Sequence, residues 1–112
     1  MSDRELLELA AKAAGVKIER CSCSNEQWPF RYAPGQPKRG HWNPLVSDGD
    51  ALRLAVKLRL LVDVPSEGNI HQTVEVVAPC VRNFIYEPCG TDAYAATRRA
   101  IVRAAAAIGE KQ

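Results

Sequence analysis

Residues 42–64 constrain the fold most, because a loop, a helix and a strand follow one another there with almost no connecting residues. Ser47 is a good helix N-cap, and Asp50 stands three residues later, which is the spacing of a capping box. Apolar side chains then recur at helical spacing: Ala51, Leu54, Ala55 and Leu58, with Leu52 and Val56 widening the stripe. A stripe this wide predicts a helix that lies on a sheet and is covered from more than one direction.

The loop before this helix begins with Trp42 and Asn43, and Pro44 restricts Asn43 to extended backbone. Buried aromatic side chains are the usual case, so we expect Trp42 to fill the core and Asn43 to bond loop backbone. The alternative is that both belong to a contact surface. Asp48 and Asp50 lie where the helix dipole is positive, and this explains them without catalysis or metal binding.

A first helix is predicted to begin at the N-cap Ser2 and to end at Gly15, a residue suited to the positive φ of a C-terminal cap. Residues 16–20 then alternate as a half-buried strand. Residues 21–41 contain three prolines and two glycines, and predict an irregular loop or an inserted hairpin that covers one sheet edge. Alternating aromatic residues within this segment indicate a short strand: Trp28, Phe30 and Tyr32.

Strand-like runs follow the central helix at residues 60–64, 70–77 and 81–87. The polar residues 66–69 predict a hairpin turn between the first two runs. Alternation predicts that each run has two distinct faces. In the third run, Phe84 and Tyr86 fall on one face and Ile85 on the other.

A last helix, capped by Thr91 or Asp92, is predicted to run to about Ile108, before Gly109. Its core stripe begins with Tyr94, and its many alanines would let it approach a neighbouring helix closely.

This order predicts an α+β fold in a single domain over residues 1–112. Largely apolar strands need both faces of their sheet covered. We therefore expect an α-β-α sandwich with a mainly antiparallel sheet of about four strands. The terminal helices would lie on one face of this sheet and the central helix on the other.

The net charge of +2 is too small to indicate nucleic acid or an anionic membrane by itself. No apolar run approaches the roughly 20 residues of a membrane helix, so no membrane partner is predicted. The first residues are mixed in charge, and no signal-peptide core follows them. We therefore expect a cytoplasmic protein whose cysteines stay reduced.

The cysteines give no strong metal motif. Cys21 and Cys23 have C-x-C spacing and Cys80 and Cys89 stand nine apart, whereas zinc knuckles use C-x₂-C pairs. Free thiols are the favoured interpretation, although the two pairs would approach each other if the strand order allowed it. Neither His41 nor His71 has the third group that a cysteine nucleophile would need. No cofactor, metal site or catalytic residue is predicted.

Two candidate surfaces remain. The first is an interaction surface for a macromolecule, made by the irregular segment and the start of the central helix: Trp28, Phe30, Tyr32, Trp42, Asn43, Asp48 and Asp50. The second is a basic face that would suit single-stranded nucleic acid, with aromatic residues available for stacking: Lys38, Arg39, Arg98, Arg99 and Arg103.

Three stretches resemble a group of small proteins of tailed phages and prophages, which are similar to the phage ABA-sandwich domain family. The most specific is WNPL at residues 42–45 followed by DGDALRLAVKL at residues 48–58. DRELLELAAKAAG at residues 3–15 and TRRAIVRAAA at residues 97–106 are similar too, whereas residues 21–41 have no counterpart. The resemblance implies a helix-sheet-helix sandwich and a gene product that acts inside an infected bacterium. It implies no activity and no catalytic residues.

The leading hypothesis is a non-enzymatic phage or prophage accessory protein that binds a host or phage protein. A single-stranded nucleic-acid binder is the first alternative, and a small metal-binding protein or hydrolase is the second. An exposed sheet edge would also favour a homodimer.

Overall fold

The computed structural model describes residues 1–23, 25–66 and 72–112. Within them the chain forms helices, one 3₁₀ turn and short strands, in this order: α1 (Asp3–Ala14), β1 (Ile18–Arg20), β2 (Phe30–Tyr32), α2 (Asp48–Lys57), β3 (Leu61–Asp63), β4 (Thr73–Ala78), η1 (Pro79–Val81), β5 (Asn83–Pro88) and α3 (Ala93–Glu110). None of the described helices is long and apolar enough to cross a bilayer. The predicted turn at residues 66–69 and His71 fall largely or wholly outside the described residues.

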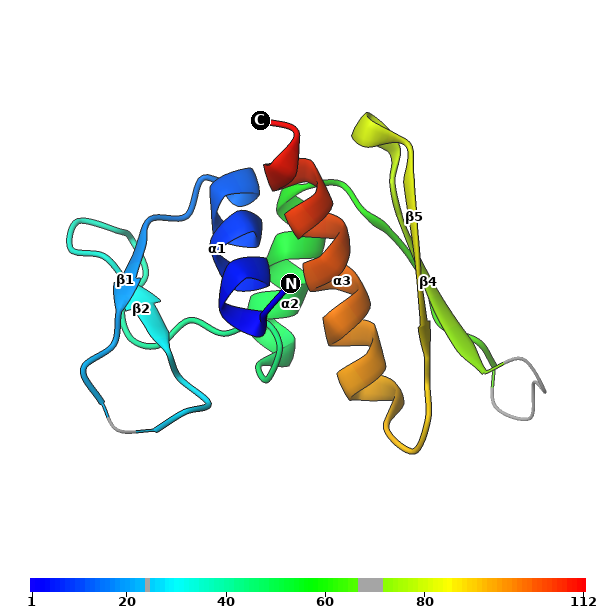
Figure 1. The fold of residues 1–112 in the computed structure, drawn as a ribbon, viewed down its shortest axis with the longest axis horizontal. Helices are drawn as coiled ribbons and strands as arrows, with labels where there is room; N and C mark the ends of the chain where they lie inside the picture. The colour runs from blue at the N-terminus through cyan, green and yellow to red at the C-terminus, as the bar shows by residue number, and fades with distance from the viewer. Residues whose placement is uncertain (24, 67–71) are drawn as a thin grey trace.

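The α+β class is confirmed, and the arrangement of its layers differs in detail from the predicted sandwich. The strands form two antiparallel sheets, β1-β2 and β3-β4-β5, in place of one sheet of about four strands. The three helices stand between the two sheets (Figure 1). The predicted hairpin within residues 21–41 pairs with β1, from Ile18 opposite Tyr32 to Arg20 opposite Phe30, so it does not cover an edge of the larger sheet.

The helix boundaries follow the predicted caps. Ser2 accepts a hydrogen bond from the Glu5 amide at the start of α1, and Gly15 ends that helix at a φ of 70°. Asp92 caps α3 by accepting from the Ala95 amide. The last helix passes through Gly109 instead of stopping before it.

Helices α1 and α3 pack side by side through small residues (Figure 1). Ala10, Ala104 and Ala105 are fully buried. At Gly109 a Cβ would lie only 2.2 Å from the carbonyl oxygen of Leu9, so the backbones touch where the glycine stands. The close approach that the alanines predicted is confirmed.

The larger sheet has one covered face and one open face. Val74, Val76 and Ala78 alternate along β4 with no exposed surface and pack toward α3. On the opposite face, Leu61 stands beside Val77 and Val77 beside Phe84. Leu61 and Phe84 are about 60% exposed, at 62% and 58%. No described helix covers this outer face, which is the main departure from the predicted sandwich.

Three apolar residues expected in the core are exposed. Leu52 and Val56 on α2 are 63% and 65% exposed, and Tyr94 in the first turn of α3 is 73% exposed. Helix α2 buries one stripe, made by Asp50, Ala51, Leu54 and Ala55, and packs mainly against α3 with a smaller contact to α1. The prediction that α2 lies on a sheet is therefore wrong, because its main contacts are with the other helices.

Candidate functional site

The loop before α2 is organised around a buried asparagine. Asn43 is 5% exposed, and its side chain donates to the Gln27 carbonyl at 2.6 Å and accepts from the Leu45 amide at 2.9 Å. Its own amide donates to the Asp50 carboxylate at 3.0 Å. Trp42, beside it, is 2% exposed. Both residues therefore play the structural roles expected of a core aromatic and a loop-bonding amide.

Asp50 joins this loop to α2. Ser47 caps the helix by accepting from the Asp50 amide at 3.2 Å. The Asp50 carboxylate, 4% exposed, turns to the Asn43 amide and to Arg53 at 2.5 Å. Asp48 instead faces solvent and pairs with Arg98 at 2.7 Å. Because the two carboxylates point to different partners, they form no acid pair. Their position at the start of α2 explains both residues without a catalytic role.

Four of the seven residues of the predicted interaction surface are buried, so that prediction is corrected. Phe30, Trp42, Asn43 and Asp50 are 2% to 5% exposed, so they cannot contact a partner without unfolding the loop. Trp28 and Tyr32 are half-buried and Asp48 is exposed. Burial, with the nearby Asp50 carboxylate, raises the pKa of the Tyr32 phenol above its ordinary value.

The predicted basic face is divided and largely paired. Arg98 donates to the Leu45 carbonyl and to Asp48, Arg99 pairs with Asp3, and Arg103 binds Glu87 and the Tyr86 carbonyl. Lys38 and Arg39 are exposed but follow β2, and the β1-β2 hairpin and α3 lie on opposite sides of α1 (Figure 1). The three arginines on α3 are each paired with a carboxylate, and the two other basic residues lie on a separate segment, so the predicted face offers a nucleic-acid backbone no continuous cationic track.

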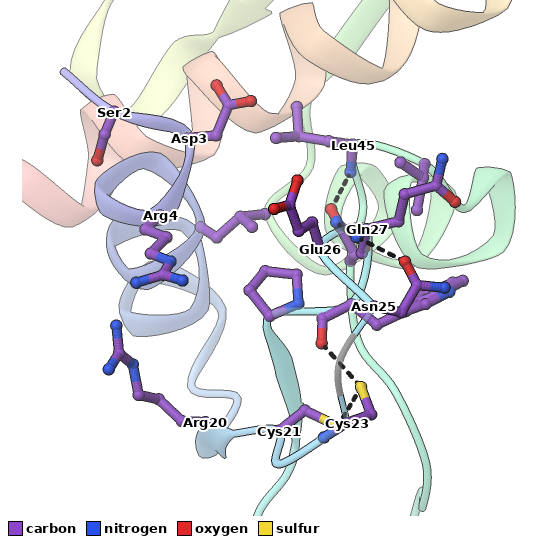
Figure 2. A pocket seen from close by; sticks show the side chains of 15 residues that line it. Ser2, Asp3, Arg4, Arg20, Cys21, Cys23, Asn25, Glu26, Gln27 and Leu45 are labelled. Atoms are coloured by element: carbon purple, nitrogen blue, oxygen red, sulfur yellow. Dashed lines mark hydrogen bonds between the residues drawn. The ribbon is translucent and has the colours of Figure 1, made fainter.

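A cleft of about 780 Å³ lies between the start of α1, the end of β1 and the loop that follows. Figure 2 shows Arg4 and Arg20 on one side of this cleft and Asn25 and Gln27 on the other. Cys21 and Cys23 stand at one end of it. The cleft therefore combines guanidinium and amide groups with apolar wall surface that includes Leu7 and Leu45.

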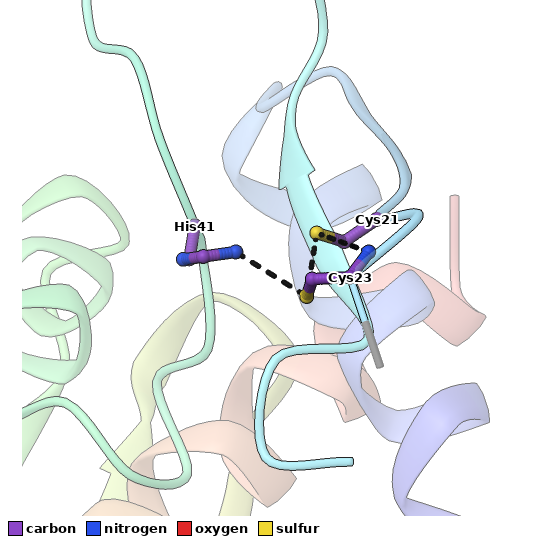
Figure 3. Close-up of side chains that lie close together, drawn as sticks. All are labelled: Cys21, Cys23 and His41. Carbon is purple, nitrogen blue, oxygen red and sulfur yellow. Dashed lines mark hydrogen bonds between the residues drawn. The ribbon is translucent and has the colours of Figure 1, made fainter. Parts of the chain in front are cut away.

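The end of this cleft brings together two thiols and an imidazole. The Sγ atoms of Cys21 and Cys23 lie 2.8 Å apart, and the Cys23 Sγ lies 3.4 Å from the His41 Nε2 (Figure 3). The Trp28 ring stacks on the imidazole with centroids 5.2 Å apart. A hydrogen bond between the thiols lowers the pKa of Cys21 and raises that of Cys23, because a thiolate at Cys21 accepts from its neighbour.

The sequence analysis paired the cysteines with one another and considered His41 only as the partner of a cysteine nucleophile, so it did not predict this group of three. The histidine lies 18 residues after Cys23, and only the pairing of His41 with Arg31 of β2 brings it near. Cys80 and Cys89 flank β5, beyond the helices from the hairpin (Figure 1), so they do not join this group. Of these two, Cys80 is exposed and Cys89 is buried.

An apolar groove of about 820 Å³ lies between α2, β3 and the start of α3. Its floor is made by buried side chains that include Ala51, Ala55 and Ile101. Its exposed walls are apolar: Leu52, Val62, Val64 and Tyr94. The helical pattern placed Leu52 and Tyr94 in the core, so the sequence already contained part of the signal for the groove, which was interpreted as burial.

Comparisons with protein-family models, with curated proteins and with solved structures gave no match for this chain.

Proposed function

We propose that this protein is a non-enzymatic binding module that holds another protein in the groove between α2, β3 and α3. The observation that carries the proposal is the exposure of apolar side chains around one hollow: Leu52 at 63%, Val64 at 48% and Tyr94 at 73%. Single exposed apolar residues need no explanation, whereas a cluster rimmed by polar groups is typical of a protein contact site.

The shape of the groove supports an amphipathic helix as the bound segment. The small and buried Ala51 and Ala55 on the floor leave room for bulky side chains, and Leu52 and Tyr94 stand on the walls. A helix that places apolar anchors at positions i, i+3 and i+7 would fill such a hollow. The Asp48–Arg98 ion pair at the rim gives the polar border that protein interfaces usually have.

The biological setting is proposed from the sequence alone. The sequence of residues 42–45 and 48–58, which resembles that of phage proteins, supports a phage or prophage accessory protein that works in the cytoplasm of an infected bacterium. The partner would then be a host or phage protein. Residues of the WNPL and DGD stretches form hydrogen bonds within the loop and at the start of α2. These residues therefore hold the part of the fold that presents the groove.

The experiment is capture of partners from phage-infected cells with the tagged full chain, followed by mass spectrometry and by binding measurements with the purified partner. Leu52→Asn and Tyr94→Ala should each weaken binding at least about fivefold, which is the size of an interface residue of moderate importance. Val56→Asn is the matched control, because Val56 is equally exposed on the same helix but does not line the groove.

Capture that survives Leu52→Asn and Tyr94→Ala unchanged would overturn the assignment of the groove. Sedimentation of the chain alone provides a separate check. A dimer that Leu52→Asn dissociates would identify a second copy as the occupant, in place of another protein.

A further inference from the structure

We propose that Cys21, Cys23 and His41 form a zinc site with three protein ligands and one open position. The three donor atoms all lie within 4.8 Å of one another. The proposal uses residues on the side of the molecule opposite the larger sheet, so it stands independently of the protein-binding groove.

The distances fit a tetrahedral ion with little movement. Zinc binds thiolate at about 2.3 Å and imidazole at about 2.0 Å, so ligand atoms in a tetrahedral site lie about 3.5 to 3.8 Å apart. The Cys23 Sγ to His41 Nε2 distance is 3.4 Å. The two sulfur atoms are 2.8 Å apart, so they must open by about 1 Å. The Cys23 side chain is exposed and Cys21 is only partly buried, so both thiols have room to change rotamer.

The backbone positions the ligands before any metal arrives. The Cys21 amide donates to the Pro29 carbonyl at 2.9 Å, which extends the β1-β2 pairing to this cysteine. On the other side of β2, His41 pairs with Arg31, and the Trp42 amide donates to the Phe30 carbonyl at 3.0 Å. Strand β2 therefore holds the cysteine and histidine segments at fixed spacing, and less ordering is needed on binding.

The donor set indicates which cation fits. Two sulfur atoms and one imidazole nitrogen, with no carboxylate in the group, match zinc and not magnesium or calcium, which prefer oxygen ligands. Two thiolates balance the charge of a divalent ion, and the stacked Trp28 ring shields one side of the imidazole. C-x-C spacing alone is weak evidence for a zinc site. The fold brings His41 next to the two cysteines, and this histidine provides a third ligand.

Cys23 and His41 are exposed, so the fourth position of the ion would be open to solvent or to a ligand from outside the group. Bound zinc would tie residues 21–23 to the segment that leads into the core loop at Trp42. It would thereby stabilise the hairpin, because an ion that binds only the folded chain raises the free energy of unfolding.

The experiment is zinc titration of the full chain, stripped of metal under a phosphine reductant, in competition with a chromophoric chelator. We expect one zinc per chain and a higher melting temperature with zinc than without. Cobalt in place of zinc should give sulfur-to-metal charge-transfer bands and the visible absorption of a tetrahedral ion. Cys21→Ser, Cys23→Ser and His41→Asn should each weaken zinc binding at least about 100-fold, while circular dichroism shows that each variant is folded.

Cys80→Ser is the matched control, because Cys80 is an exposed thiol outside the group. It should bind zinc as the parent does. The absence of zinc binding by the reduced parent would overturn the proposal, and so would zinc binding that Cys80→Ser abolishes. Binding that His41→Asn leaves unchanged would overturn the three-ligand site, since the histidine separates this site from a plain pair of thiols.

Discussion

Replacing Gly109 by alanine should destabilise the protein, although alanine is the better helix former. Gly109 lies within α3, and a Cβ there would stand 2.2 Å from the Leu9 carbonyl oxygen and 2.9 Å from its carbonyl carbon. The Leu9 oxygen belongs to the backbone and cannot move by a change of rotamer, so α1 and α3 would have to separate by about 1 Å. Overpacking of this kind costs about 1 to 3 kcal/mol.

The gain in helix propensity offsets less than about 1 kcal/mol of that cost, because Gly109 stands one residue from the helix end. The net loss should be about 1 to 2 kcal/mol, which corresponds to a fall in Tm of roughly 5 to 10 °C. Thermal unfolding followed by circular dichroism measures this change in Tm, and Gly49→Ala is the control. At Gly49 the nearest atoms belong to the end of the Arg53 side chain, at 3.4 Å, and these can move.

Gly49→Ala should therefore leave the Tm unchanged or raise it. A Gly109→Ala protein that melts at or above the parent temperature would refute the close packing of α1 on α3.

Three further perturbations test other parts of the structure. Trp42→Ala removes a large side chain that is 2% exposed, and should lower the free energy of unfolding in a urea titration by about 3 to 5 kcal/mol. Asp50→Asn weakens the buried bond to the Asn43 amide and the ion pair with Arg53, and the same titration should show a loss of about 1 to 3 kcal/mol. Burial raises the pKa of Tyr32 above its ordinary value, so the folded state holds the phenol proton more tightly than the unfolded state. Stability should then fall as the pH rises through the folded pKa, and Tyr32→Phe should reduce that fall when melting temperatures are compared across alkaline pH.

The helices could be predicted from the sequence because their signals are local. Ser2, Ser47 and Asp92 cap the predicted helices in the structure, and Gly15 takes the left-handed conformation expected at a helix end. The alternation of β5 also held, with Phe84 exposed and Ile85 packed inward.

The division of the strands into two sheets could not be predicted in this way, because pairing partners are set by contacts distant in sequence. An apolar stripe shows which side of a helix avoids water, but not how much of it a neighbour covers. Leu52, Val56 and Tyr94 were placed in the core for that reason, and they lie exposed. The meeting of Cys23 with His41 depends on the pairing beside β2, and the spacing of the cysteines contains no information about it.

Site-specific crosslinking tests the proposed binding groove most directly. A photoreactive phenylalanine analogue would be placed at Tyr94 in the groove or at Phe84 on the open face of the sheet, two aromatic positions that are 73% and 58% exposed. After illumination of phage-infected cells, we predict a covalent adduct with another protein from position 94 and none from position 84. An adduct from position 84 alone would show that partners bind the sheet face, and would contradict the groove.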